Sequence, residues 1–381
     1  MSSDLFKPKF FQQKILKVVL IILFLFFGVF LRLNYLNEKG GDFKTHEKAI
    51  LDFMAGNNIY EEIIKSYSQK NTGDHGYAYF PTLMYIYIPL YRLSNLLNIE
   101  PYVLFKIPVF LADVLVGIII FKFLYGDKKD FWSAFFGTAF WWINPHLVTR
   151  GSYAHTEPLG IIFLILALKN LEKSDVKAGF FYAISFSLKS FSLVLFPLFL
   201  FKSKNKLKFL ISGAVFAFII SIPFMASFQN FITYIQGSIL VHGSREPQGR
   251  PLLGYLSFLI NKSRYYVIFT QPLKYLSLIF GSIVSAFLYF KKKITDKYVL
   301  AFVCMLFFYL LTPVFMRTYL IWFLPLYAVG VYNFIYSFKN KIKKNFEVFY
   351  FLSLSLFWGF YAFYLSIWEE SFWFSENGIG L

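Results

Sequence analysis

Asp42 is the residue of this chain best placed for acid–base chemistry. It follows Gly40 and Gly41, and a stripe of residues at helical spacing comes directly after it. The stripe consists of His46, Ala49, Ile50, Phe53 and Met54, and Gly56-Asn57 would end the helix. A carboxylate just before such a helix is either an N-cap or a catalytic group that takes a proton from a substrate. His46 on the same helix is a candidate substrate-binding residue.

A second group of reactive side chains lies between residues 149 and 158. Arg150, His155 and Glu157 bring together a cation, an imidazole and a carboxylate. Anchoring at a membrane surface explains an arginine, but not a histidine and a glutamate at the mouth of an apolar segment. We therefore predict that Arg150 and His155 bind an anionic group, and we take Glu157 as a candidate substrate-binding residue.

Lys189 lies inside an otherwise apolar stretch, which indicates a functional site unless its side chain reaches back to the membrane surface. The run Ala178–Phe201 has the length of one bilayer span, yet lysine clusters flank both of its ends. Such clusters mark the cytoplasmic side. We therefore predict two short helices that meet at Lys189, each about 11 residues or roughly 16 Å long.

Further cations occur late in the chain, in segments predicted to be external. The segment 226–264 contains His242 and Arg245 among several basic residues, and Arg317 lies in another turn. Basic external segments suit lipid headgroups or another anion, so these three residues are candidate substrate contacts. Asp113 lies within an apolar run, where we expect a hydrogen bond between helices rather than catalysis.

The composition predicts the elements that must position these side chains. The 381 residues are 57% hydrophobic, 23% aromatic and 15% charged, against about 25% charged in soluble proteins. The net charge of +17 lies in short lysine clusters between apolar stretches, which predicts membrane orientation rather than binding of nucleic acid. We therefore predict an all-α polytopic membrane protein that forms a single domain over residues 1–381.

The apolar stretches and lysine clusters together predict a topology with a cytoplasmic N-terminus. At roughly 20 residues per span, the two half-helices and the other apolar runs give about 11 crossings. The external segments are 35–100 and 226–264, and Tyr79–Leu97 is a surface helix that does not cross. The predicted spans are 15–31, 102–124, 132–148, 157–171, 209–225, 265–290, 298–315, 318–337 and 347–367.

Familiar nucleotide and metal motifs are absent from the sequence. It contains no glycine-rich phosphate loop, no dinucleotide fingerprint, no His-Glu-x-x-His and no His/Cys cluster with metal-ligand spacing. A nucleotide-sugar enzyme would also need a soluble nucleotide-binding domain. One carboxylate and several cations around an outward-facing cavity suit a substrate that carries a phosphate and a lipid tail.

The order and spacing of several residues resemble those of the GT-C membrane glycosyltransferases. The likeness is to mannosyltransferases that use polyprenyl-phosphate mannose, including the first mannosyltransferase of glycosylphosphatidylinositol assembly and bacterial α-mannosyltransferases. It covers roughly residues 15–201. The pattern consists of Asp42, Ala49, Gly56, Tyr60, Tyr79-Phe80-Pro81, Lys106, Asp113, Asn144-Pro145, Arg150-Gly151 and Lys189.

The resemblance implies an outward-facing site, a polyprenyl-phosphate sugar as donor and inversion at the sugar. It implies that Asp42 is the general base, that Lys189 lies near the donor phosphate and that Tyr79 contacts substrate. Many relatives have two acids spaced by one residue. Here the other position is Gly40, so a metal-binding pair is not supported. No cofactor is certain, and a divalent metal is left open without support from the sequence.

The predicted function is transfer of one sugar to a lipid, glycan or protein acceptor on the external face, and mannose is the expected sugar. The membrane would be the plasma membrane of a prokaryote or the endoplasmic reticulum of a eukaryote. A non-catalytic transporter or flippase of lipid-linked glycans is one alternative, and a polymerase or ligase of surface polysaccharide is another. Transporters often contain internal repeats, and none is found here.

Overall fold

A computed structural model describes residues 8–68, 76–126, 130–145, 147–148, 156–242, 248–249, 265–312, 314–315, 318–338 and 345–369. Nearly all regular structure in these ranges is helical. The exception is a parallel pairing of two short strands, β1 (Gln248–Gly249) and β2 (Val314–Phe315). The prediction of an all-α fold is confirmed.

Four of the described helices are long and apolar enough to cross a membrane. The first is Ile15–Leu33, which is most of α1 (Pro8–Leu33), and the second is α5 (Pro101–Tyr125). The third, Lys206–Met225, consists of α10 (Lys206–Ser221) and the 3-10 helix η4 (Ile222–Met225). The fourth is α15 (Tyr319–Ser337). The first three expose many apolar side chains, whereas α15 lies mostly inside the bundle. Apolar side chains exposed in this way fit a lipid solvent, so the chain is a membrane protein.

The other apolar helices are shorter or only partly described. Three of them, α13 (Tyr265–Phe290), α14 (Lys297–Leu311) and α17 (Phe346–Glu369), coincide with predicted spans. Two further predicted spans form α6 (Phe131–Trp142) and α7 (Glu157–Asn170), with 12 and 14 residues. Both are shorter than the roughly 20 residues of a full crossing.

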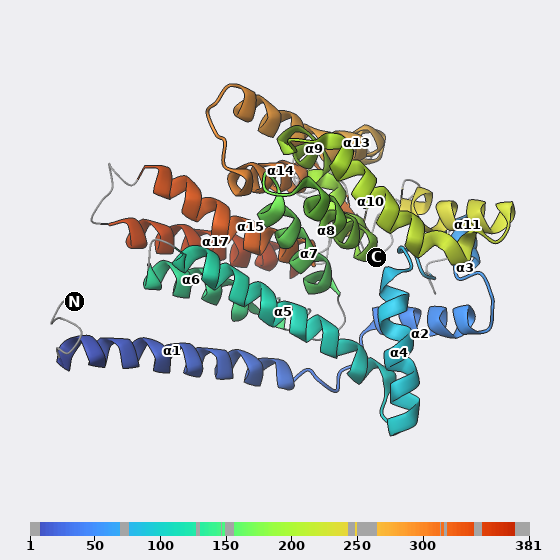
Figure 1. Cartoon of the computed structure of the whole chain (residues 1–381), viewed down its shortest axis with the longest axis horizontal. Coiled ribbons are helices and arrows are strands. Elements are labelled where there is room, and N and C mark those ends of the chain that lie inside the picture. Colours follow the sequence, from blue (N-terminus) through green and yellow to red (C-terminus); the bar gives the residue numbers. More distant parts are fainter. Residues whose placement is uncertain are drawn as a thin grey trace.

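Several short helices gather at one end of the bundle, where α1 ends and α5 begins (Figure 1). These helices are α2 (Gly41–Met54), α3 (Glu61–Ser68), α4 (Thr82–Leu97) and α11 (Phe228–Ser238). In Figure 1, α4 runs across the direction of α1 and α5, and it is not among the four long apolar helices. The sequence predicts Tyr79–Leu97 as a surface helix that does not cross, and α4 has neither the length nor the direction of the long apolar helices (Figure 1).

The chain reverses direction at Lys189, as predicted. There, α8 (Asp175–Leu188) ends and the 3-10 helix η3 (Ser190–Leu195) leads into α9 (Phe196–Lys202). The extended backbone of Lys189, with φ −159° and ψ 125°, breaks the helix. At the far ends of the two arms, Lys202 forms an ion pair with Glu172, which lies just before α8. Both outer ends of the broken helix therefore lie on the same side of the bundle.

Small residues allow α8 to pack closely against α10. A Cβ atom added to Gly179 would lie 2.1 Å from the carbonyl oxygen of Phe209, so only glycine permits this backbone contact. At the other end of the bundle, Arg32 of α1 pairs with Asp113 of α5 at 2.6 Å. The predicted interhelical hydrogen bond of Asp113 is thus confirmed, and it connects the first two long helices.

Candidate functional site

Asp42 lies in the first turn of α2 and is not its N-cap. The N-cap residue is Gly40, and no side chain caps this helix terminus. The interpretation of Asp42 as an N-cap is therefore wrong. The partial positive charge of a helix N-terminus favours a carboxylate at this place, and Asp42 is half-buried rather than fully exposed.

Lys189 and Glu157 form a buried ion pair, in which the ammonium group donates a hydrogen bond to Oε1 of the carboxylate. Glu157 is the first residue of α7 and has no exposed surface. The Lys189 Nζ also lies 5.7 Å from the centre of the Tyr79 ring. Removing two charges from water costs several kcal/mol per ion, so the pair must be judged by its surroundings as well as by its burial.

Electrostatic interactions link Asp42 to this ion pair. Burial lowers the pKa of Lys189, but Glu157 first, then Tyr79 and Asp42, raise it, and the net change is upward. Burial also raises the pKa of Tyr87 in α4, and the carboxylates of Asp42 and Glu157 raise it further. The first turns of α2 and α7, the break at Lys189 and the middle of α4 therefore converge on one place.

His46 is packed among tyrosines beside this place. Its side chain is buried, and its ring centre lies 5.9 Å from that of Tyr77, 6.2 Å from that of Tyr79 and 5.7 Å from that of Tyr87. The Tyr60 hydroxyl donates to the carbonyl of Tyr79 at 2.9 Å, which fixes this segment before α4. His46 and Tyr79, both candidate substrate residues, thus lie together, and the Tyr79 ring is near both His46 and the Lys189 ammonium.

Two buried hydrogen-bond donors near the ion pair lack a partner among the described residues. They are the hydroxyl of Tyr87 and the indole nitrogen of Trp322 in α15. The Trp322 ring stacks on Phe191, two residues after Lys189, with ring centres 5.7 Å apart. Leaving such a donor unpaired costs about 1–3 kcal/mol, so both are available for a polar ligand. Sequence reasoning missed both residues, although each is a polar-tipped aromatic in an apolar helix.

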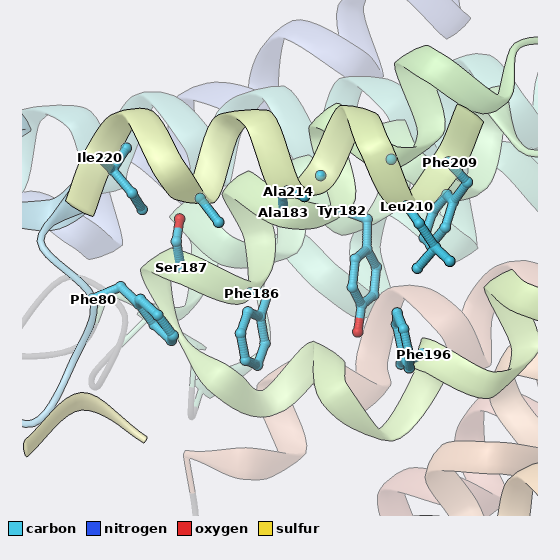
Figure 2. Close-up of a pocket in the computed structure, with 13 residues that line it drawn as sticks. Phe80, Tyr182, Ala183, Phe186, Ser187, Phe196, Phe209, Leu210, Ala214 and Ile220 are labelled. Carbon is cyan, nitrogen blue, oxygen red and sulfur yellow. The ribbon is translucent and has the colours of Figure 1, made fainter. Parts of the chain in front are cut away.

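An apolar pocket of about 260 Å³ lies between α8, α9 and α10 (Figure 2). Phe80, Ser187 and Ile220 lie at one end, and Phe209 lies at the other. Ser187 precedes Lys189 by two residues and accepts a hydrogen bond from the Thr82 hydroxyl at 2.7 Å. One end of the pocket therefore lies close to the ion pair, and the other extends along the helices.

Several predicted site residues lie outside the described residues. They are Arg150, His155, Arg245 and Arg317. The backbone of His242 ends the 3-10 helix η5 (Leu240–His242), but its side chain also lies outside the described part. Within the described ranges, no group of three or more His, Cys, Asp or Glu side chains could hold a metal ion.

Family models and curated proteins supply no function that could be transferred to this chain. The chain matches no protein-family model and no curated protein. The functional argument therefore rests on Asp42, the Lys189–Glu157 pair and the apolar pocket beside them.

Proposed function

We propose that this protein is a membrane glycosyltransferase of the GT-C type that transfers one sugar, mannose in the first place, from a polyprenyl-phosphate donor. The observation that carries the proposal is the buried Lys189–Glu157 ion pair at the helix break, which lies beside an apolar pocket and close enough to Asp42 for that carboxylate to raise the pKa of Lys189. A carboxylate, a buried cation and an apolar cavity correspond to the three parts of the reaction: an acceptor hydroxyl, a phosphate and a lipid chain.

In the proposed reaction, the acceptor hydroxyl oxygen attacks the anomeric carbon of the donor sugar from the side opposite the phosphate. Asp42 takes the hydroxyl proton as the new glycosidic bond forms. The bond between the anomeric carbon and the phosphate oxygen breaks, and its electron pair remains on the lipid phosphate. The Lys189 ammonium stabilises the negative charge that grows there. The configuration at the anomeric carbon is inverted.

The apolar pocket beside Lys189 would receive the beginning of the donor's hydrocarbon chain. Its polar end at Ser187 lies two residues from the cation that binds the phosphate, and its walls are formed by apolar and small side chains of α8 and α10. Ligand pockets for whole small molecules occupy about 300–1,000 Å³. At 260 Å³, this pocket suits a segment of one chain rather than a complete lipid.

The proposed topology has about 11 crossings at roughly 20 residues each, a cytoplasmic N-terminus and a site on the external face of a plasma or endoplasmic reticulum membrane. Lys189 then lies on the external side. A chain with Lys189→Cys in a Cys304→Ala background should react with an impermeant thiol reagent added outside. Reaction from the cytoplasm alone would contradict this orientation.

Transfer is tested directly with membranes that contain the protein and radiolabelled polyprenyl-phosphate sugars. The expected result is labelled product on a lipid, glycan or protein acceptor, and Asp42→Asn membranes serve as the control. Binding or movement of the labelled donor across the bilayer without any product would instead support the transporter alternative. Product that grows into a long polymer would support the polymerase alternative.

A further inference from the structure

Lys106 is a buried cation that the proposed chemistry does not use. It lies in the second turn of α5, and its residue surface is only 4% exposed. A lysine in an apolar helix of a membrane protein is costly and requires a partner. Unlike Lys189, it is not bound to a carboxylate side chain through any of the hydrogen bonds described here.

The partners of Lys106 are backbone carbonyl groups in the turn between α1 and α2. Its Nζ donates to the carbonyl oxygens of Tyr35 at 2.7 Å, Leu36 at 2.7 Å and Glu38 at 2.5 Å. A lysine ammonium has three donors, so this turn occupies all of them. These residues follow the end of α1 at Leu33, and their carbonyl oxygens are strong acceptors that a cation can satisfy away from water.

The same turn leads directly to Asp42. Glu38 precedes the N-cap Gly40 by two residues, and Asp42 lies in the first turn that follows. On the other side of Asp42, the Phe43 ring is buried, with its centre 6.0 Å from the Lys106 Nζ and 6.3 Å from the ring centre of Phe105. The Lys106 region of α5 therefore holds the backbone before Asp42 and the side chain after it.

We infer that Lys106 is a positioning residue that fixes the Asp42 carboxylate at the site by binding the three carbonyl groups of the preceding turn. This inference rests on the proposed role of Asp42 as the general base. Lys106 acts through the backbone of residues 35–38 and does not contact the reacting atoms. Donor binding depends instead on Lys189 and the pocket, which belong to α8, α9 and α10.

The kinetic test compares Lys106→Met with Lys122→Met, which removes an exposed lysine near the other end of α5. Loss of one charged hydrogen bond changes a rate or equilibrium constant by a factor of roughly 10 to 150. In Lys106→Met, kcat for transfer should therefore fall by at least about tenfold. The donor KM should stay unchanged, and Lys122→Met should behave as the unmodified chain. Lys106→Arg keeps the charge and should restore part of the lost kcat, which also provides a test if Lys106→Met does not fold.

A labelling experiment tests the inference without any activity. Asp42→Cys in a Cys304→Ala background is treated with an impermeant maleimide, with either Lys106 or Lys106→Met in the same chain. Release of the turn should raise the labelling rate by about tenfold or more, because each lost charged hydrogen bond is worth that factor. If Asp42→Asn retains transfer but labelling still depends on Lys106, Asp42 is not the general base. Lys106 would then still be shown to position residue 42. Equal labelling rates together with an unchanged kcat in Lys106→Met would overturn the inference.

Discussion

Two buried ion pairs, Arg32–Asp113 and Lys189–Glu157, differ in their surroundings more than in their burial. Arg32 also donates to the carbonyl groups of Gly28 at 2.8 Å and Trp142 at 2.9 Å, and its guanidinium lies 4.0 Å from the centre of the Trp142 ring. The Asp113 carboxylate accepts a second hydrogen bond from the Trp141 indole at 2.8 Å. These groups hold the C-terminal ends of α1 and α6 against α5.

Lys189 and Glu157 lie at helix ends. Lys189 separates two helical arms, and Glu157 is the first residue of α7. Their neighbours include the half-buried Asp42, two donors without a described partner and one end of an apolar pocket.

The comparison shows that burial of a charge pair does not by itself indicate function. Both pairs have buried donors without a described partner nearby, Nη2 of Arg32 and Nε1 of Trp142 in the first case, so unused donors do not distinguish them. The Arg32 pair connects helices through backbone and indole groups. The Lys189 pair lies at a helix break beside an apolar cavity, where one partner can be exchanged for a ligand. Single and double substitutions distinguish the two cases.

The largest effect is expected at Asp42, the carboxylate that acts on the Lys189 pair. Asp42→Asn preserves size but cannot accept the acceptor's proton, and general base catalysis contributes typically about 10²–10⁴-fold. The transfer rate should fall by at least about 100-fold, while binding of the labelled donor persists. Asp52→Asn, near the other end of α2, is the matched control and should transfer normally. Transfer by Asp42→Asn near the unmodified rate would refute the mechanism.

The second effect concerns the Arg32 pair and stability. Arg32→Met leaves the Asp113 carboxylate buried without its counter-ion, which destabilises a protein by about 3–5 kcal/mol. The thermal unfolding midpoint in detergent should therefore fall markedly. Adding Asp113→Leu removes the lone charge and should recover most of the midpoint and the transfer activity. A double variant that folds but transfers no sugar would show that this pair also has a functional role.

The Lys189 pair should behave in the opposite way. Replacing both partners by Lys189→Met with Glu157→Leu removes two buried charges at once, and such a replacement is often neutral for stability. Donor affinity should nevertheless fall roughly 10- to 150-fold, the equivalent of one charged hydrogen bond to the phosphate. Equilibrium binding of a polyprenyl phosphate measures this change. Unchanged affinity in a folded double variant would remove Lys189 from the phosphate site.

The smallest expected effect is a shift of the pH profile in Glu157→Gln. Glu157 is the foremost group that raises the pKa of Lys189, whereas burial lowers it. Without the carboxylate, burial dominates, the pKa falls and the ammonium loses its proton at a lower pH. The alkaline limb of the transfer profile should therefore move to lower pH, and transfer at acidic pH should be retained. An alkaline limb that stays in place would show that the charge of Lys189 does not limit transfer.

The sequence alone determined the class of the protein and much of its local structure. Apolar stretches of span length specify α1, α5, α10 and α15, because a bilayer accepts only backbones whose hydrogen bonds are satisfied internally. Lysine clusters at both ends of 178–201 specified the reversal at Lys189, since one crossing would have separated them. The stripe after Asp42 specified α2, because its spacing has the helical period.

The tertiary structure decided which side chains meet. The helices α7 and α8 lie between Glu157 and Lys189 in the chain, and nothing in the spacing of these two residues shows that they form a pair. Gly40 rather than Asp42 caps α2, because the helix begins at Gly41, ahead of the carboxylate. The unused donors of Tyr87 and Trp322 and the three carbonyl groups around Lys106 depend on contacts between helices far apart in the chain. Local periodicity specifies which face of a helix is apolar, whereas only the packed arrangement of several helices determines which polar group on that face finds a partner.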